Sequence, residues 1–295
     1  MDDLPADLRA HAELGEFLRS RRARISPAQV GLSGEAGPRR VPGLRRKEVA
    51  RLAGVSVDYY VRLERGHRIN VSEAVLNAIA RALQLNELER AHLFTLTRST
   101  RSRSRPLPTR QEVRPGLRQV LDALTDTPAI VLGRRTDVLA VNALGRALFA
   151  DFDALPVQER NMARFVFLNE EARTLYVDWA DAARGIVATL NLYAGTHPHD
   201  PLLAELIGEL SLRDEDFRRW WADHDVYQRT HGTKSYRHPL VGHLALNYEV
   251  LVPADDPEQM LGIMTADPGS ASAEALRLLA SWTTRPADES TRTHR

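Results

Sequence analysis

The segment from Lys47 to Gly66 constrains the fold most, because two short runs with helical apolar spacing flank Gly54. Glycine lacks a Cβ and can adopt the left-handed conformation that a tight interhelical turn requires. Ala50 is small where the two helices would cross, and Ser56 can cap the second helix. The inward positions are apolar, at Val49, Ala53, Val55, Tyr60 and Leu63. The segment therefore predicts two short helices joined by a tight turn.

Helical patterns continue on both sides of this segment. Apolar spacing predicts helices over residues 11–24, 72–83 and 86–97, and the last begins with Asn86 and an acid three residues later, as in a capping box. Four glycines and three prolines stand between residues 26 and 43, which argues against an ordered helix and predicts a long loop. The N-terminal part is therefore expected to be an all-α bundle.

The formal net charge of +1 conceals two halves of opposite sign. Residues 1–105 carry 20 basic and 12 acidic side chains, whereas the remaining residues carry 20 basic and 27 acidic ones. The sign changes at an Arg/Ser-rich run, which is typical of a flexible linker. We expect a domain over 1–97, a linker over 98–110, a second domain over 111–285 and a disordered tail over 286–295. Such asymmetry favours a nucleic-acid-facing module joined to another module.

Features missing from the sequence exclude several classes of protein. Without cysteine there is no disulfide, thiolate metal site or cysteine nucleophile. The chain lacks a membrane-length apolar run and an apolar signal segment, so a cytoplasmic protein without membrane association is expected. His197, His199 and Asp200 lack a second ligand pair, so no metal site is predicted. No hydrolase, zinc-protease or nucleotide-loop motif occurs, so we expect neither enzymatic activity nor a cofactor.

The second half mixes helical and β-prone patterns. Two β-prone runs at 129–133 and 138–141 predict a hairpin, followed by a helix capped by Asn142. Helices are predicted over 113–124, 170–194, 201–210, 214–223 and 273–282, and late strands over 234–238, 242–252 and 260–266. Strands that bracket a helical middle indicate an α+β domain.

The N-terminal region, over about residues 12–97, resembles the Cro/repressor-type (XRE) helix-turn-helix family. Its matching motifs are Leu18-Arg19-x-x-Arg22, Glu48-Val-Ala-x-x-Ala-Gly-Val-Ser56, Leu63-Glu64-x-Gly66 and Leu76-x-x-Ile79-Ala80-x-Ala82-Leu83. The resemblance implies that the second helix of the motif enters the major groove of double-stranded DNA. The candidates for groove contact are Ser56, Val57, Asp58, Tyr59 and Arg62. The candidates for phosphate contact at the preceding helix start are Arg45, Arg46 and Lys47.

Structural roles compete with these DNA contacts. The family pattern implies that Arg22 and Glu64 form an internal ion pair. Asp58 is expected either to accept a hydrogen bond from a cytosine amino group or to cap its helix. Tyr59 is expected either in the core or in contact with a base. Arg46 and Lys47 could instead be solvent-exposed charges without a DNA contact. Tyr60 is expected in the core. The loop is longer than is usual in this family, and we expect its Arg39 and Arg40 to contact phosphates or the minor groove.

Most of the chain also resembles the MmyB-like transcription regulators. The motifs that carry this resemblance lie at 43–49, 57–64, 89–93, 138–142, 220–226, 232–234, 238–242 and 246–249. It implies a C-terminal domain with a PAS-like α+β fold that binds a small apolar ligand, with fatty acids as the ligand class. A homodimer is expected, because helix-turn-helix proteins read paired half-sites.

A fatty acid needs an apolar site with one polar anchor. The candidates for the apolar wall are Trp179, Ile186, Leu190, Tyr193, Trp220 and Tyr248. The candidates for the carboxylate anchor are Arg184, Arg229 and His238. Each wall residue has the alternative of an ordinary core position, and the second domain has the alternative of only dimerising or recruiting a protein.

Overall fold

The computed structural model describes residues 6–32, 43–67, 69, 71–99, 111–198, 200–226 and 229–283. Arg39 and Arg40, residues 100–110 of the predicted linker and the predicted tail lie outside the described residues. The chain forms two compact units. One unit contains the N-terminal helices together with residues 187–209 and 218–226, and the other contains the rest of the described residues after 110.

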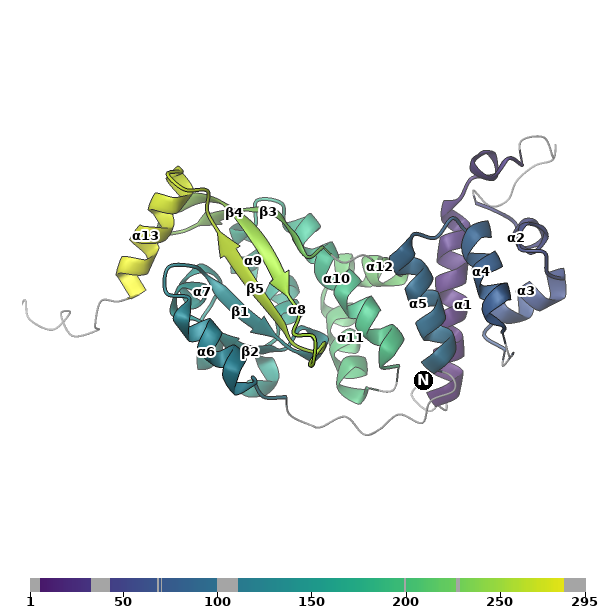
Figure 1. Ribbon diagram of the computed structural model, residues 1–295, viewed down its shortest axis with the longest axis horizontal. Helices are drawn as coiled ribbons and strands as arrows, with labels where there is room; N and C mark the ends of the chain where they lie inside the picture. The colour runs from purple at the N-terminus through teal and green to yellow at the C-terminus, as the bar shows by residue number, and fades with distance from the viewer. Residues whose placement is uncertain are drawn as a thin grey trace, which may run out of the picture. The chain divides into compact units, whose positions relative to one another are not determined.

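The first unit begins with a helical bundle, as the sequence predicts. Its elements are α1 (Ala6–Arg24), the 3₁₀ helix η1 (Pro27–Val30), α2 (Arg46–Leu52), α3 (Val57–Glu64), α4 (Glu73–Ala82) and α5 (Glu87–Ser99), coloured purple to blue in Figure 1. The expectation that residues 26–43 exclude an ordered helix is wrong for η1, because Pro27 fits a first helical turn and Gly31 ends it with a φ of 71°. Helix α5 also runs two residues into the predicted linker.

Side-chain caps fix where these helices begin. Ser56 Oγ accepts from the Tyr59 amide at 3.1 Å. The predicted capping box is confirmed at α5, where Asn86 Oδ1 accepts from the Glu89 amide at 2.8 Å and Glu89 Oε2 accepts from the Asn86 amide at 3.0 Å. Gly54 has a φ of +66°, so the turn between α2 and α3 uses the conformation expected of glycine.

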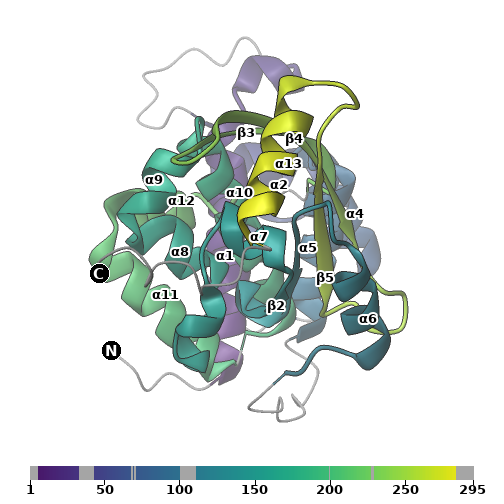
Figure 2. The ribbon, with the colours of Figure 1, turned by 90° about the vertical axis from the view of Figure 1, so that its left-hand side faces the viewer.

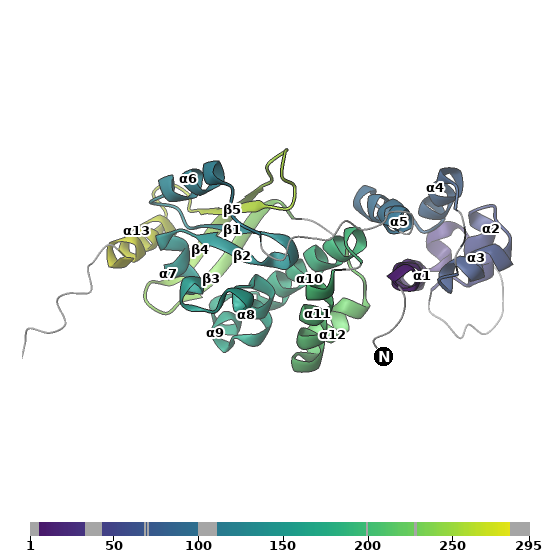
Figure 3. The same ribbon diagram turned by 90° about the horizontal axis from the view of Figure 1, so that it is seen from below.

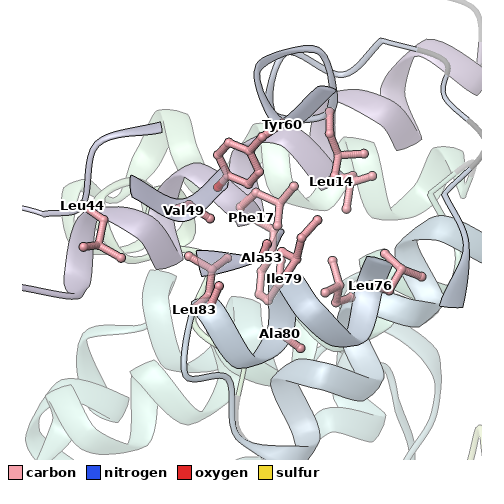
Figure 4. Packing of buried hydrophobic residues seen from close by; sticks show 14 of the residues in the cluster. Leu14, Phe17, Leu44, Val49, Ala53, Tyr60, Leu76, Ile79, Ala80 and Leu83 are labelled. Atoms are coloured by element: carbon pink, nitrogen blue, oxygen red, sulfur yellow. The ribbon is translucent and has the colours of Figure 1, made fainter. Parts of the chain in front are cut away.

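Helices α1 to α5 enclose one apolar core, seen from close by in Figure 4. Phe17 of α1, Tyr60 of α3 and Ile79 of α4 are all fully buried in it. Ala50 of α2 and Ala53, which directly follows α2, are buried too, so small side chains lie where α2 packs against its neighbours. Burial of each large apolar side chain stabilises the fold by about 1.5–3 kcal/mol, so this core fixes the direction in which α3 faces.

Residues from the second half of the chain complete this first unit. Val226 belongs to its buried core, and Leu192 packs against that core. Asn191 Nδ2 donates to the Asp225 carbonyl at 3.0 Å, and Arg24 donates to the Asp223 carbonyl at 2.8 Å. The compact unit therefore extends beyond the domain predicted over 1–97.

The second unit is built on an antiparallel sheet with the order β2-β1-β5-β4-β3 among its described residues. The strands are β1 (Ala129–Leu132), β2 (Val138–Val141), β3 (His231–His238), β4 (Gly242–Leu251) and β5 (Met260–Thr265). Its helices are α6 (Pro115–Ala123), α7 (Ala143–Leu148), α8 (Met162–Leu168), α9 (Glu170–Leu175) and α13 (Ala271–Thr283), with 3₁₀ turns at 134–136, 152–154 and 157–159. The expected α+β class and the β1–β2 hairpin are confirmed.

Helices cover both faces of this sheet (Figure 3). Leu117 and Leu121 of α6 pack on one face with Val131 and Leu261. The opposite face carries Tyr236 and the β4 residues that follow its register, and it lies toward α8 and α9. Helix α13 packs against α7 and β4 (Figure 2).

The predicted helix over 170–194 is wrong in its middle. The chain forms α9, leaves the helical conformation at Tyr176 and begins α10 (Trp179–Thr196) at Trp179. Tyr176 forms a bridge with Tyr236, and the Val177 amide donates to the Ser235 carbonyl at 3.0 Å. Pairing with distant β3 therefore overrides the local helical pattern. Helices α11 (Pro201–Arg213) and α12 (Glu215–Ala222) follow near the predicted places.

We expect Gly15→Ala to lower the free energy of unfolding. A Cβ at Gly15 of α1 would lie 2.5 Å from the Glu64 carbonyl oxygen, so the α1–α3 contact has to open, at a cost of about 1–3 kcal/mol. Urea unfolding followed by circular dichroism measures the change. Gly116→Ala in α6 is the control, because nothing lies within 4 Å of its added Cβ. Equal stabilities of the two variants would contradict this account of α1–α3 packing.

Candidate DNA-binding and ligand-binding sites

The N-terminal end of α3 presents the face that the sequence predicts. Ser56, Val57, Asp58 and Arg62 are exposed and Tyr59 is half-buried, whereas Tyr60 and Leu63 lie in the core. Val57 is an apolar side chain that is 46% exposed. The predicted groove candidates therefore lie together on or beside the outer surface of one capped helix.

Behind this face, a buried carboxylate joins α1, α2 and α3. Glu64 accepts two hydrogen bonds of 2.8 Å from Arg22, through Nε and Nη2. Arg46 Nε donates to the same carboxylate at 2.9 Å. Arg22 Nη1 also donates to the Leu44 carbonyl at 2.7 Å, which holds the chain just before α2. The predicted Arg22–Glu64 ion pair is confirmed.

Two opposing effects set the pKa of Glu64. Burial disfavours the carboxylate, but the hydrogen bonds and positive charges of Arg22 and Arg46 outweigh it and hold the pKa below its usual value. Glu64 is therefore ionised at neutral pH.

The three cations predicted to meet phosphates at the start of α2 differ in their surroundings. Arg46 donates a hydrogen bond to Glu64, whereas Lys47 is exposed and Arg45 is half-buried. The amide of Arg45 donates to Glu48 Oε2 at 2.6 Å, so Glu48 caps α2. The predicted contacts of Arg39 and Arg40 lie outside the described residues.

Several predicted ligand residues in the second unit already serve its packing. Trp179 Nε1 donates to the Val166 carbonyl at 2.8 Å, and its ring lies 3.8 Å from the Arg173 guanidinium carbon. His238 Nε2 lies 2.9 Å from the Ala147 carbonyl oxygen, and Nδ1 lies 3.3 Å from the Leu240 amide nitrogen. Both ring nitrogens of His238 therefore contact the backbone. Arg184 is exposed, and Ile186 is half-buried.

Three other candidates belong to the first unit. Leu190 and Trp220 are buried there. The Tyr193 hydroxyl donates to Asp200 at 2.8 Å, and the Tyr193 ring stacks on His197. The nine proposed ligand residues are thus divided between the units, six in the second and three in the first.

The sequence reasoning missed a polar cluster on the sheet. Lys234 Nζ lies 4.7 Å from the centre of the Tyr248 ring, and the ring of buried Tyr236 lies 5.2 Å from that of Tyr176. Lys234 and Tyr236 were not among the residues predicted for a ligand site, whereas Tyr248 was. The available signal was the alternation of Lys234, Tyr236 and His238, which places all three on one face of a strand.

A tight α2–α3 turn, an exposed α3 and a separate α+β unit define a helix-turn-helix DNA-binding protein with an additional domain. Residues 13–93 match the family model of a helix-turn-helix domain. Residues 113–279, more than half of the chain, match the MmyB-like transcription regulator ligand binding domain. The chain belongs to the MmyB-like transcription regulator family and combines a DNA-binding domain with a ligand-binding domain.

Among curated proteins, none matches the chain. Across the described residues, none of the helices has the length and apolarity needed to cross a membrane.

We expect Glu64→Gln to destabilise the protein by about 3 kcal/mol at pH 7, because Arg22 loses a buried charged partner. The folded-state pKa of Glu64 is lowered, so its contribution is present above the unfolded-state pKa and is lost as the pH falls through the folded-state pKa. Urea unfolding at a series of pH values should show the two proteins converging in acid. Glu87→Gln is the control, because the Arg90–Glu87 pair is exposed and contributes about 0.5 kcal/mol or less. A pH-independent difference would contradict the role given to the carboxylate.

Proposed function

We propose that the protein is a sequence-specific transcription regulator that places α3 in the major groove of double-stranded DNA and responds to a small apolar ligand such as a fatty acid. The exposed N-terminal face of α3 carries the DNA half of this proposal. That face is rigid, because Ser56 caps the helix and Tyr60 and Leu63 hold its other side in the core. A preorganised helix avoids the entropic cost of ordering on binding.

The side chains on this face suit different contacts. Arg62 has the fork of donors that pairs with a guanine edge, and the exposed methyl groups of Val57 suit the methyl group of thymine. Ser56 and Tyr59 supply hydroxyls beside them. Asp58 suits a cytosine amino group, since its carboxylate only accepts hydrogen bonds.

The proposal also includes contacts with the phosphates of the DNA. Lys47 and Arg45 lie at the start of α2, where exposed amides and positive side chains together attract phosphate. Arg46 contributes less to phosphate binding, because Glu64 compensates part of its charge. Arg39 and Arg40 extend the contacts along the loop. Because its partner is DNA, we place the protein in the cytoplasm, as a homodimer on paired half-sites.

The membership of residues 113–279 in a ligand-binding family supports the sensing half of the proposal. A ligand changes DNA affinity only if it binds one arrangement of the dimer better than another. The second candidate function, in which this domain only dimerises or recruits a protein, predicts no effect of any lipid.

For DNA recognition, we expect Arg62→Ala to weaken binding to the operator by about tenfold or more and to leave binding to random DNA nearly unchanged. Lys47→Ala should weaken binding to both alike and reduce the slope of log affinity against log salt by about one unit. Fluorescence anisotropy at several salt concentrations measures both effects, with the operator taken from footprinting on the protein's own promoter.

Arg118→Ala, an exposed cation of the second unit, is the control. In the same titration, the double variant Arg39→Ala/Arg40→Ala should lower the salt slope. Equal losses on operator and random DNA for Arg62→Ala would contradict the base-reading role of α3.

For ligand sensing, we expect the protein purified from its host to retain an apolar small molecule and its operator affinity to change when that molecule is removed. Native mass spectrometry detects the retained molecule, and anisotropy with and without a lipid extract measures the response. If no molecule is retained and the extract has no effect, the non-sensing function is favoured instead.

A further inference from the structure

The face of the sheet that lies toward α8 and α9 carries a group of polar side chains at one end. The register pairs Gly232 with Tyr248, Lys234 with Leu246 and Tyr236 with Leu244, so these side chains share one face of β3 and β4. Tyr176, between α9 and α10, forms its bridge with Tyr236 on the same strand. Three tyrosines and one lysine from distant parts of the chain therefore come together.

These polar groups are buried or half-buried without polar partners. Tyr236 is 1% exposed and Tyr176 is 7% exposed, while Lys234 and Tyr248 are half-buried. Among the described residues, neither the Lys234 ammonium nor any of the three hydroxyls forms a hydrogen bond or ion pair. The ammonium instead lies over the Tyr248 ring. None of these four polar atoms is among the fully buried atoms that lack a partner, so each keeps some exposure and an acceptor can reach it.

The charges around the cluster favour a singly charged anion as that acceptor. Arg229 donates to both carboxylate oxygens of Asp181, at 2.6 and 2.7 Å, so these two charges compensate each other. Among the described residues Lys234 forms no ion pair, and Asp181 is already paired with Arg229. One ammonium with hydroxyl donors suits a carboxylate, whereas a doubly charged phosphate would be only half compensated.

Apolar side chains continue from the cluster along the same face of the sheet. Leu244 and Leu246 are fully buried beside Tyr236, and Met264 lies opposite Tyr248 on β5. The ring of Phe149 lies 6.0 Å from that of Tyr236. The neighbours of the cluster on this face are therefore apolar, which matches a ligand with an apolar body.

We infer that Lys234, assisted by the hydroxyls of Tyr236 and Tyr248, binds the carboxylate of a monocarboxylic acid with an apolar body. This assignment rests on the proposed ligand-sensing function and replaces Arg184, Arg229 and His238 as the anchor. Arg229 is paired with Asp181, and the His238 ring contacts the backbone through both nitrogens.

The anchor predicts a pH dependence. Burial lowers the pKa of Lys234, Asp181 opposes this shift, and Arg229 adds to it. The other titratable groups that face it are Tyr236 and Tyr248, whose pKa values burial raises, so both keep their protons. Affinity for a carboxylate is therefore full while Lys234 is charged and falls as the pH rises through its lowered pKa, before an ordinary lysine would titrate.

Isothermal titration calorimetry of the full chain with decanoate and with decanol tests this assignment, because the two probes share a chain and differ in charge. We expect the wild-type protein to prefer decanoate at least tenfold. Lys234→Met should abolish the preference for decanoate, and Lys234→Arg should keep most of it. Tyr248→Phe should weaken the binding of decanoate severalfold. Arg237→Met is the matched control, because Arg237 is exposed on the opposite face of the same strand and its loss should change nothing.

The outcomes separate the anchor from the proposed function. A decanoate preference that survives in Lys234→Met, or a wild-type protein that binds both probes equally, would overturn the anchor and leave ligand sensing intact. A wild-type protein that binds neither probe would overturn both. If Lys234→Met does not fold by circular dichroism, Tyr236→Phe and Tyr248→Phe, which remove one hydroxyl each, take its place, and a decanoate preference unchanged in both variants would overturn the anchor.

Discussion

The first unit depends on the Glu64 carboxylate and the arginines around it. Arg22 from α1 and Arg46 from α2 both donate to this residue at the end of α3, so one buried group fixes three helices relative to each other. An apolar contact alone would allow α3 to slide by a fraction of a turn, whereas directed hydrogen bonds do not. The exposed side chains at the N-terminal end of α3 gain their fixed positions in part from this interaction.

The DNA-binding half was predictable because its signals are local. Gly54, Ser56 and the Asn86–Glu89 box act through the backbone within a few residues, and each does what its spacing predicts. The Arg22–Glu64 pair is not local, and it was predicted only because a family resemblance supplied the pairing. The assignment of Arg46 to phosphate did not anticipate that its guanidinium donates to Glu64.

The second half was less predictable because distant pairing decides it. Helical spacing runs through 170–194, but Tyr176 and Val177 gain more from pairing with β3 than from continuing the helix. The same limitation affected the ligand residues. Aromatic and basic side chains were chosen by type, and His238 and Trp179 proved to bind the backbone. Lys234 was overlooked because a lysine on the covered face of a sheet becomes visible only when the register is known.

Helices α10, α11 and α12 each have residues in both compact units. The Arg/Ser-rich run is where the sequence suggests that the protein can be divided, yet Leu192 and Val226 lie beyond it and pack with the N-terminal helices. A fragment that ends at Ser99 would lack these side chains, so part of that core would be exposed to solvent. The helices before the Arg/Ser-rich run are therefore not a complete unit, because the side chains that close their core come from more than 90 residues further along the sequence.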